Sequence, residues 1–424
     1  MTMIYALILF AVTYVLMLTF TKYRPYIALG SAVVFIATGM LPFDQIFGAI
    51  DWNVLLMIAG TMGLVQLFID SRMPARLADM IMLKVPNVQM AAVALALFAG
   101  IISAFVDNVA TVLMVAPVAL AICKKLKTNP VPFIIGIAVS SNLQGAATLV
   151  GDTTAIMLGS YADMSFLDFF WYKGRPGIFF AVELGAIASA LILAWLFRRE
   201  KDSIEQRGEL TPVTDYVPTV LLVGMIALLI SASFIPVKPD ITNGLICVSL
   251  FIIGMVYTFA RTRSADAFLG PIKSIDFETI GLLFGLFLVI GGITNMGVVD
   301  AAAGLLARMG GGNVFVIYTV IVWASVLFSA FIDNIPYVAT MLPVVTGLAS
   351  TLGIDPTLLY FGLLSGATLG GNCTPIGASA NITGIGILRR EGYEVKTGDF
   401  CRIGIPFTLA AVIPAYIYFW LLYE

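Results

Sequence analysis

Long runs of apolar residues, separated by short polar breaks, follow one another along the whole chain. A bilayer with a hydrocarbon core of about 30 Å needs about 20 apolar residues per helical crossing, and ten runs approach or exceed that length. They lie at residues 2–20, 26–41, 52–69, 132–159, 177–197, 216–236, 241–260, 279–297, 357–387 and 403–422. Two short amphipathic stretches lie at 71–86 and 299–310. The pattern predicts an all-α polytopic membrane protein with about ten transmembrane helices.

Two further apolar runs, residues 89–122 and 314–348, carry the same polar pair near their middle. The first contains "SAFVDNVATVLMVAP" with Asp107-Asn108, and the second contains "SAFIDNIPYVATMLP" with Asp333-Asn334. We expect each run to be a re-entrant hairpin with the Asp-Asn pair at its tip. This topology places 19 Lys and Arg residues in the loops on one side of the membrane and 4 on the other, as the positive-inside rule requires.

The same bias predicts where the ends of the chain lie. The basic loops would face the cytoplasm, both termini would lie outside, and the membrane would be the inner (plasma) membrane. The first run could be mistaken for a signal peptide, but its charges, Lys22 and Arg24, follow it. We therefore expect it to be a retained transmembrane helix.

The two halves of the chain resemble each other. Ile50-Asp51-Trp52 matches Ile275-Asp276-Phe277 at an offset of 225, and the two Asp-Asn pairs match at an offset of 226. "TLVGDTTAI" from Thr148 also matches "TLGGNCTPI" from Thr368, at an offset of 220. Each half would have five crossings and one hairpin, and an odd number of crossings inverts the second half. This predicts an inverted-topology repeat, as in many secondary transporters.

Composition agrees with a membrane protein and excludes several kinds of site. The chain is 60% hydrophobic and 11% charged, whereas soluble domains carry about 25% charged residues. It has no histidine, which excludes imidazole metal sites and histidine proton relays. Its four cysteines show no CxxC spacing, and its net charge of −2 does not indicate a nucleic-acid partner. We expect no cofactor beyond a bound Na⁺ or H⁺, and the lipid bilayer as surroundings.

Four polar breaks interrupt the apolar runs at mid-membrane depth. Two are the hairpin tips, and two are Gly-rich segments at residues 140–155 and 365–381. Non-helical backbone survives at this depth only beside protein or a water-filled cavity. Each break starts a half-helix whose N-terminus carries a partial positive charge. We expect the four helix ends to gather into one site for an ion or a polar solute.

Three acids lie in these breaks: Asp107, Asp152 and Asp333. In one interpretation they and Asn372 are helix N-caps, for which Asp and Asn are favoured. In the other the acids bind the transported species or a proton, because an ionisable residue within a membrane span is a functional-site hypothesis by default. With about half a positive charge per helix end, the summed charge is near −1. That sum suits one monovalent cation, or a few protons with a neutral solute.

Side chains with oxygen atoms accompany the acids in both Gly-rich breaks. They are Asn142, Gln144, Thr148 and Thr154 in the first break, and Thr368, Thr374, Ser379 and Asn381 in the second. They could contact the solute, although small and hydroxyl residues also serve helix packing. Cys373 is expected to fill space, Glu183 has no assigned role, and Asp51 and Asp276 are expected to cap helices on opposite faces.

The motifs "SAFVDNVATVLMVAP", "NLQGAATLVGDTTAIMLG" and "LGGNCTPIGASANITGIGI" resemble the ion transporter superfamily. The similar branch holds arsenite permeases, D-type sodium–proton antiporters and the melanosomal P protein, and divalent-anion:sodium symporters are more distantly similar. The resemblance covers nearly the whole chain. It implies ten spans, two re-entrant hairpins, a homodimer and an elevator-like movement of a transport domain. The binding residues that it implies are Asp107, Asn108, Gly151, Asp152, Asp333, Asn334, Gly371, Asn372 and Asn381.

The resemblance also divides the chain into parts. Residues 1–88 and 216–312 would form a scaffold, residues 89–200 and 313–424 would form the transport domain, and residues 201–215 would be a cytoplasmic linker. One departure concerns the substrate. Where the family reads Gly-Asp-Pro-Pro-Asn, this chain reads Gly-Asp-Thr-Thr-Ala at residues 151–155, and the glycine usual at the position of Cys373 is absent.

The sequence leaves several functions open. The leading hypothesis is a proton-linked secondary transporter, for sodium–proton exchange or export of a neutral oxyacid such as arsenite, and not an enzyme. A sodium-coupled citrate- or succinate-type symporter is less favoured, because no arginine lies in the four breaks. An intramembrane aspartyl protease would need Gly-x-Gly-Asp, whereas residues 149–152 read Leu-Val-Gly-Asp. A channel stays open, because the same broken helices could line a pore.

Overall fold

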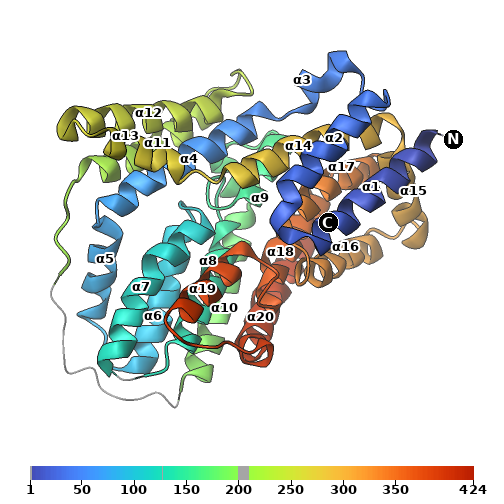
Figure 1. Cartoon of the computed structure of the whole chain (residues 1–424). Helices are drawn as coiled ribbons and strands as arrows, with labels where there is room; N and C mark the ends of the chain where they lie inside the picture. Colours follow the sequence, from blue (N-terminus) through green and yellow to red (C-terminus); the bar gives the residue numbers. More distant parts are fainter. Residues whose placement is uncertain (1, 127, 199–209) are drawn as a thin grey trace.

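The structure is a computed structural model that describes residues 2–126, 128–198 and 210–424, and it is almost entirely helical (Figure 1). The first half contains α1 (Thr2–Thr19), α2 (Arg24–Ala37), α3 (Ile46–Ala49), α4 (Trp52–Asp70), α5 (Met73–Met82), α6 (Val88–Ser103), α7 (Asn108–Leu126), α8 (Val131–Gly145), α9 (Thr153–Tyr161) and α10 (Ile178–Leu196). The second half contains α11 (Val217–Ser233), α12 (Thr242–Thr262), α13 (Ala265–Lys273), α14 (Phe277–Asn295), α15 (Val298–Met309), α16 (Val314–Ser329), α17 (Asn334–Leu352), α18 (Thr357–Gly370), α19 (Ser379–Arg390) and α20 (Thr397–Tyr423). The 3₁₀ turns are η1 (Thr21–Tyr23), η2 (Phe43–Gln45), η3 (Phe166–Phe169) and η4 (Gly371–Cys373), and the strands β1 (Trp171–Tyr172) and β2 (Arg175–Pro176) pair antiparallel.

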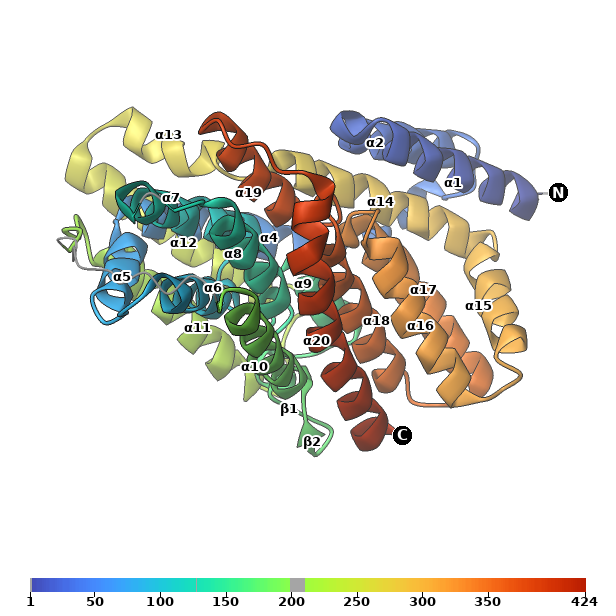
Figure 2. The same cartoon turned by 90° about the horizontal axis from the view of Figure 1, so that it is seen from below.

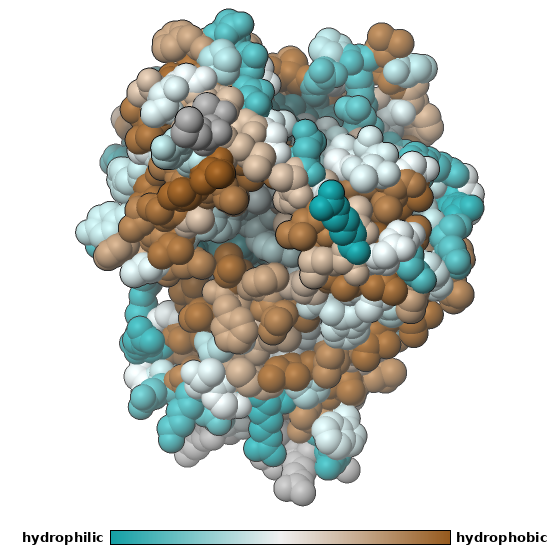
Figure 3. All heavy atoms as spheres, turned by 90° about the vertical axis from the view of Figure 1, so that its right-hand side faces the viewer, coloured by the Kyte–Doolittle hydropathy of each residue, from teal (hydrophilic) through white to brown (hydrophobic). Residues whose placement is uncertain are grey.

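The predicted apolar runs are helical, and the chain is a multi-pass membrane protein. Within the described ranges, seven helices are long and apolar enough to cross a membrane, or up to nine if each of two bent pairs counts as one span. The seven are α4, α7, α10, α12, α14, α17 and α20. Apolar side chains cover much of the face shown in Figure 3, and polar ones gather mainly towards its edges.

Two groups of helices make up the molecule (Figures 1 and 2). We call α1, α2, α4, α11, α12 and α14 the layer, because they lie together along one side. We call α6–α10 and α16–α20 the bundle. In the bundle α10 packs against α20, and Figure 2 shows α6–α8 on one side of this pair and α16–α18 on the other.

Equivalent helices of the two halves begin with equivalent caps. Asn87 Oδ1 accepts a hydrogen bond from Met90 N (2.9 Å) at the start of α6, and Asn313 Oδ1 accepts one from Val316 N (3.2 Å) at the start of α16. The predicted caps Asp51 and Asp276 are confirmed. Each carboxylate accepts from the third following amide, at 3.0 Å in both cases. Such caps satisfy amides that a helix cannot pair internally.

The N-terminal helices differ from the prediction of two separate spans at 2–20 and 26–41. Helices α1 and α2 form a bent pair with an angle of 117° around η1. Helix α2 has 14 residues, so it rises only about 21 Å. The bend carries Arg24 into the protein, where its side chain is 18% exposed. The predicted linker is only partly described: residues 199–209 lie outside the described ranges, and Thr211 N then donates to Asp79 Oδ2 of α5 (2.8 Å).

The layer is held by two close helix crossings, α4 on α12 and α2 on α14. A Cβ at Gly60 of α4 would lie 2.5 Å from the backbone carbon of Cys247, and a Cβ at Gly285 of α14 would lie 2.7 Å from that of Ala28. Glycines at these crossings let the backbones approach closely, as small residues do in membrane helix pairs. Each crossing joins one helix of the first half to one of the second.

The crossing at Gly60 gives a stability prediction. In Gly60→Ala the new methyl group meets backbone atoms that cannot rotate away, so we expect unfolding free energy to fall by about 1–3 kcal/mol. Gly224→Ala on α11 is the matched control, since a Cβ there has nothing within 4 Å. Thermal unfolding of the purified variants in detergent measures the difference. Equal melting temperatures for both variants would contradict the close crossing.

Candidate functional site

The hairpin tips are the gaps between α6 and α7 and between α16 and α17. Asp107 Oδ2 accepts hydrogen bonds from Val109 N (3.0 Å) and Ala110 N (3.2 Å). Asp333 Oδ1 accepts one from Ile335 N (3.1 Å). Both acids therefore cap the second helix of their hairpin, as the capping interpretation predicted. Each carboxylate uses only one oxygen for the cap, which leaves the other for a further partner.

Each Gly-rich break is fastened to the hairpin tip of its own half. Thr148 Oγ1 donates to Ala104 O, and Thr374 Oγ1 donates to Ala330 O. A Cβ on Gly151 would lie 2.6 Å from a carbonyl oxygen of the same break, and a Cβ on Gly377 would lie equally close. The threonine hydroxyl and the missing Cβ therefore fold each break tightly against its tip.

These contacts correct the predicted alignment of the two halves. Thr148 and Thr374, and likewise Gly151 and Gly377, are 226 positions apart, the offset that also relates the two Asp-Asn pairs. The match of "TLVGDTTAI" with "TLGGNCTPI" at an offset of 220 is wrong. The two stretches share several residues, but these residues do not make equivalent backbone contacts. The equivalent stretch is "TPIGASANI", residues 374–382. Asp152 therefore has Ala378 as its counterpart.

Asn372 is not a helix cap, so that part of the capping interpretation is wrong. Helix α19 begins at Ser379 with Ala378 as N-cap, whereas Asn372 lies in η4. Its side-chain nitrogen donates to Val139 O (3.0 Å). Six residues separate Asn372 from the first residue of α19, because Thr374 and Gly377 first pack the break against its hairpin tip.

Four buried amides connect the first hairpin tip with the second Gly-rich break. Asn108 Nδ2 donates to Asn142 Oδ1 (2.9 Å). Asn142 Nδ2 donates in turn to Asn372 Oδ1 (2.9 Å) and Asn381 Oδ1 (3.0 Å). All four side chains are buried. Asn142, near the C-terminal end of α8, thus joins the two halves beside their broken segments.

Asp152 forms a second connection between the halves. It occupies the N-cap position of α9, but its side chain makes no capping bond. Its Oδ2 accepts instead from Thr154 Oγ1 (2.9 Å) and from Asn334 Nδ2 of the second tip (3.3 Å). Thr154 Oγ1 also lies 3.0 Å from Thr368 Oγ1. The Asp152 carboxylate is therefore turned towards the protein interior.

Asp333 has a basic partner that the sequence analysis missed. Its Oδ2 accepts from Ser379 Oγ (3.1 Å) and from Arg24 Nη1 (3.4 Å). Arg24 was counted among the loop charges, because hydropathy does not reveal the bend between α1 and α2. One signal was available: Pro25 follows Arg24, and proline is favoured in the first turn of a helix. The two side chains are 18% and 11% exposed.

A cavity of about 350 Å³ lies between the layer and the bundle. Five predicted site residues line it: Asp107, Asn108, Asp152, Asn334 and Ser379. From the layer side come Gln66 and Asp276, and Asp276 was predicted only as a remote cap. The described residues that line this cavity include no Lys or Arg. The other predicted site residues lie outside its lining: Asn142, Gln144, Thr148, Gly151, Thr154, Asp333, Thr368, Gly371, Asn372, Thr374 and Asn381.

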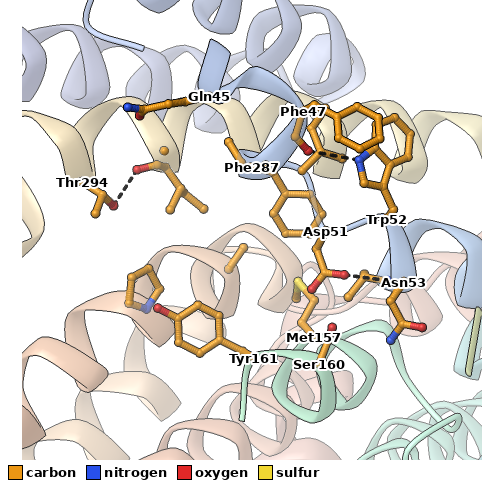
Figure 4. Close-up of a pocket in the computed structure, with 18 of the residues that line it drawn as sticks. Gln45, Phe47, Asp51, Trp52, Asn53, Met157, Ser160, Tyr161, Phe287 and Thr294 are labelled. Atoms are coloured by element: carbon orange, nitrogen blue, oxygen red, sulfur yellow. Dashed lines mark hydrogen bonds between the residues drawn. The ribbon is translucent and has the colours of Figure 1, made fainter. Parts of the chain in front are cut away.

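A larger cavity of about 980 Å³ lies at the opposite ends of α4 and α14 (Figure 4). Asp51 and Trp52 border it from the layer, and Met157 and Tyr161 border it from α9. No predicted binding residue lines it. Helix α9 extends from one cavity to the other, since Asp152 at its N-cap lines the smaller one.

The described residues contain no group of three or more Cys, Asp or Glu side chains that could hold a metal ion together. Asp107, Asp152 and Asp333 therefore do not form a joint carboxylate cage of the kind that binds Ca²⁺. The sodium ion expected near Asp107 and Asp333 stays a prediction. The ligands that line the cavity are carboxylate, amide and hydroxyl oxygens.

Comparison with known proteins identifies related transporters. The profile of the citrate transporter family (CitMHS) matches the chain in two overlapping stretches, residues 7–363 and 244–424. An uncharacterised transporter of Mycobacterium tuberculosis is 30% identical over 442 residues, which cover 99% of both chains. The P protein of Homo sapiens is 28% identical over 387 residues, which cover 74% of this chain and 46% of that protein. The crystal structure of the Alcanivorax borkumensis YdaH transporter aligns with a TM-score of 0.62 at 14% identity, over 95% of this chain and 97% of that chain, and so shares the fold.

The amide network gives a prediction for Asn142. In Asn142→Ala three buried asparagines lose a partner, and an unsatisfied buried polar group costs about 1–3 kcal/mol. We expect the melting temperature in detergent to fall accordingly. Ser365→Ala is the control, because the buried Ser365 hydroxyl has no hydrogen-bond partner in the described structure and its loss should be neutral. A stable Asn142→Ala protein would show that the network contributes little.

Proposed function

This chain belongs to the citrate transporter family of secondary carriers, and we propose that it exchanges protons for a small inorganic cation or an uncharged oxyacid at the Asp107–Asp152 cavity. One observation carries the proposal. Three carboxylates, those of Asp107, Asp152 and Asp276, line a cavity whose described lining has no basic residue. Such a cavity attracts cations and protons.

The same charges disfavour a free carboxylate substrate. An anion with two or three negative charges would meet like charges on the cavity wall, and like charges in contact repel strongly where water is scarce. An uncharged oxyacid avoids that repulsion. It could exchange hydrogen bonds with protonated Asp107 or Asp152 and with the amide of Asn334. The proton leaves the acid when a cation takes its place.

Alternating access is part of the proposal. The layer would act as the scaffold (residues 1–88 and 216–312), and the bundle would act as the transport domain (residues 89–200 and 313–424), moving in an elevator-like manner. Two features support this division. The cavities lie between layer and bundle at opposite ends of α4 and α14, and α9 borders both. The offset of 226 that the tips and the Gly-rich breaks share also supports a repeat, which five spans and one hairpin in each half would invert.

Location and assembly complete the proposal. The excess of basic residues in one set of loops favours an inner (plasma) membrane protein with both termini outside. The resemblance of the motifs favours a homodimer and a place near arsenite permeases and sodium–proton antiporters. The similarity to the P protein supports that placement.

A citrate-type carrier is the second candidate, and two observations favour it. The family is described as citrate transporters, and Arg24 places a guanidinium at the second hairpin tip, which the sequence analysis had not expected. Arg24 is already paired with Asp333, however, and neither residue lines the cavity. A carboxylate would therefore have to displace Asp333.

Flux measurements test the function. The full-length chain is reconstituted in liposomes under an imposed pH gradient and offered sodium, lithium, arsenite, silicate, citrate and succinate. We expect proton-linked flux of a cation or an oxyacid. Citrate or succinate flux without either would overturn the proposal in favour of the second candidate.

Removing the cavity charges gives the matching mutational prediction. Asp107→Asn and Asp152→Asn should each lower flux at least about tenfold, which corresponds to about 1.4 kcal/mol, because the proton site is lost while the side-chain shape is kept. Asp355→Asn is the control: Asp355 also caps a helix, with Thr357 N 2.9 Å from its Oδ1, but it lines neither cavity. Unchanged flux in the double variant Asp107→Asn/Asp152→Asn would defeat the assignment.

A further inference from the structure

The two hairpin tips carry the same Asp-Asn pair in opposite electrostatic surroundings. Across the cavity from Asp107 lies a second acid, Asp276. Beside Asp333 lies a base, Arg24. The repeat therefore preserves the tip acid while the layer that faces it differs.

We propose that the Arg24 guanidinium is a built-in cation that occupies the ion site of the second tip, so that only the first tip, at Asp107, accepts an exchangeable monovalent cation. This inference rests on the proposed function and names the ligand class and the stoichiometry of its site. It makes Arg24 a residue that determines how many cations the protein binds.

Two hydrogen bonds hold the Arg24 side chain in place. Its Nε donates to Met17 O (3.2 Å) while Nη1 donates to Asp333 (3.4 Å). Nearby, Tyr14 Oη of α1 donates to Pro336 O (2.7 Å) in the first turn of α17. An arginine is charged at every physiological pH. The cation at the second tip is therefore permanent and tethered.

The first tip lacks such a partner. Within the described ranges Asp107 takes part in none of the four ion pairs. Its two capping bonds both go to Oδ2, and Oδ1 accepts no hydrogen bond from a described residue. Asp107 lines the cavity, together with Asp152 and Asn334. Carboxylate and amide oxygens are the ligands that a hard cation prefers.

A fixed positive charge at one tip changes the number of cations that the site can bind. Two equal acids at two helix N-termini would offer two equivalent cation positions. With Arg24 in one of them, the remaining position holds one cation or the protons that replace it. Sodium is the probe of choice, because it is monovalent and binds oxygen ligands.

Equilibrium binding of radioactive sodium to the purified full-length chain tests the inference. The wild type should bind one ion per chain. Arg24→Gln, which exposes Asp333, should bind two. Arg24→Lys, which keeps the charge, and Arg24→Gln/Asp333→Asn, which removes both charges, should each bind one. One ion per chain in Arg24→Gln would overturn the role of Arg24.

A second comparison does not depend on any Arg24 variant folding. In the wild-type background Asp107→Asn should lose sodium binding, whereas Asp333→Asn should keep one site. Equal loss in both variants would overturn the inference, because the tips would then be equivalent. Absence of sodium binding by the wild type would count instead against the cation arm of the proposed function. The two failures are therefore distinguishable.

Discussion

The structure depends on one constraint: backbone N–H and C=O groups that leave helical geometry inside the membrane must find hydrogen-bond partners. Water cannot satisfy such groups in the hydrocarbon region, so protein groups must do so. Here Asp107 and Asp333 accept hydrogen bonds from backbone amides of their own tips. The threonine hydroxyls of the Gly-rich breaks donate hydrogen bonds to backbone carbonyl groups of the tips. Because every break needs polar partners, the breaks gather in one place. A polar site between the halves follows from that requirement.

The repeat preserves the residues that shape the backbone, including the two tip acids, but it does not preserve the acid of the first Gly-rich break. Thr148 and Gly151 have the equivalents Thr374 and Gly377, but Asp152 has Ala378 as its equivalent. At one helix contact of each half, the small and the large residue have also changed places. A Cβ at Gly100 would meet the side chain of Gln144, whereas the equivalent pair is Val326 and Gly370, with the large residue on the other helix. Each half thus keeps the fold, and the two halves together make one asymmetric site.

Much of this could be predicted from the sequence, because hydropathy and helix caps are local properties. The apolar runs, the broken segments and the caps Asp51 and Asp276 all follow from them. The remaining features depend on tertiary contacts. The bend that brings Arg24 to Asp333 cannot be recognised from hydropathy. The sequence also does not reveal that a helix cap such as Asp276 lines a cavity. The predicted offset of 220 was wrong for a related reason: residues of the same type matched in sequence, but their contacts in the structure are not equivalent.

The two tips also differ in their contacts with the layer, which bears on the movement proposed for the bundle. The second tip is docked on the layer through Arg24 and Tyr14, and α2 is itself pressed against α14 at Gly285. Both tips border the smaller cavity, since Asp107 and Asn334 line it, but among the described residues only the second tip accepts these hydrogen bonds from α1 and α2. A displacement of the whole bundle along the membrane normal would have to break the docking contacts, whereas a rotation about the second tip would keep them. In the proposed movement, the Arg24–Asp333 pair would therefore be either the contact that a displacement breaks or the pivot of a rotation.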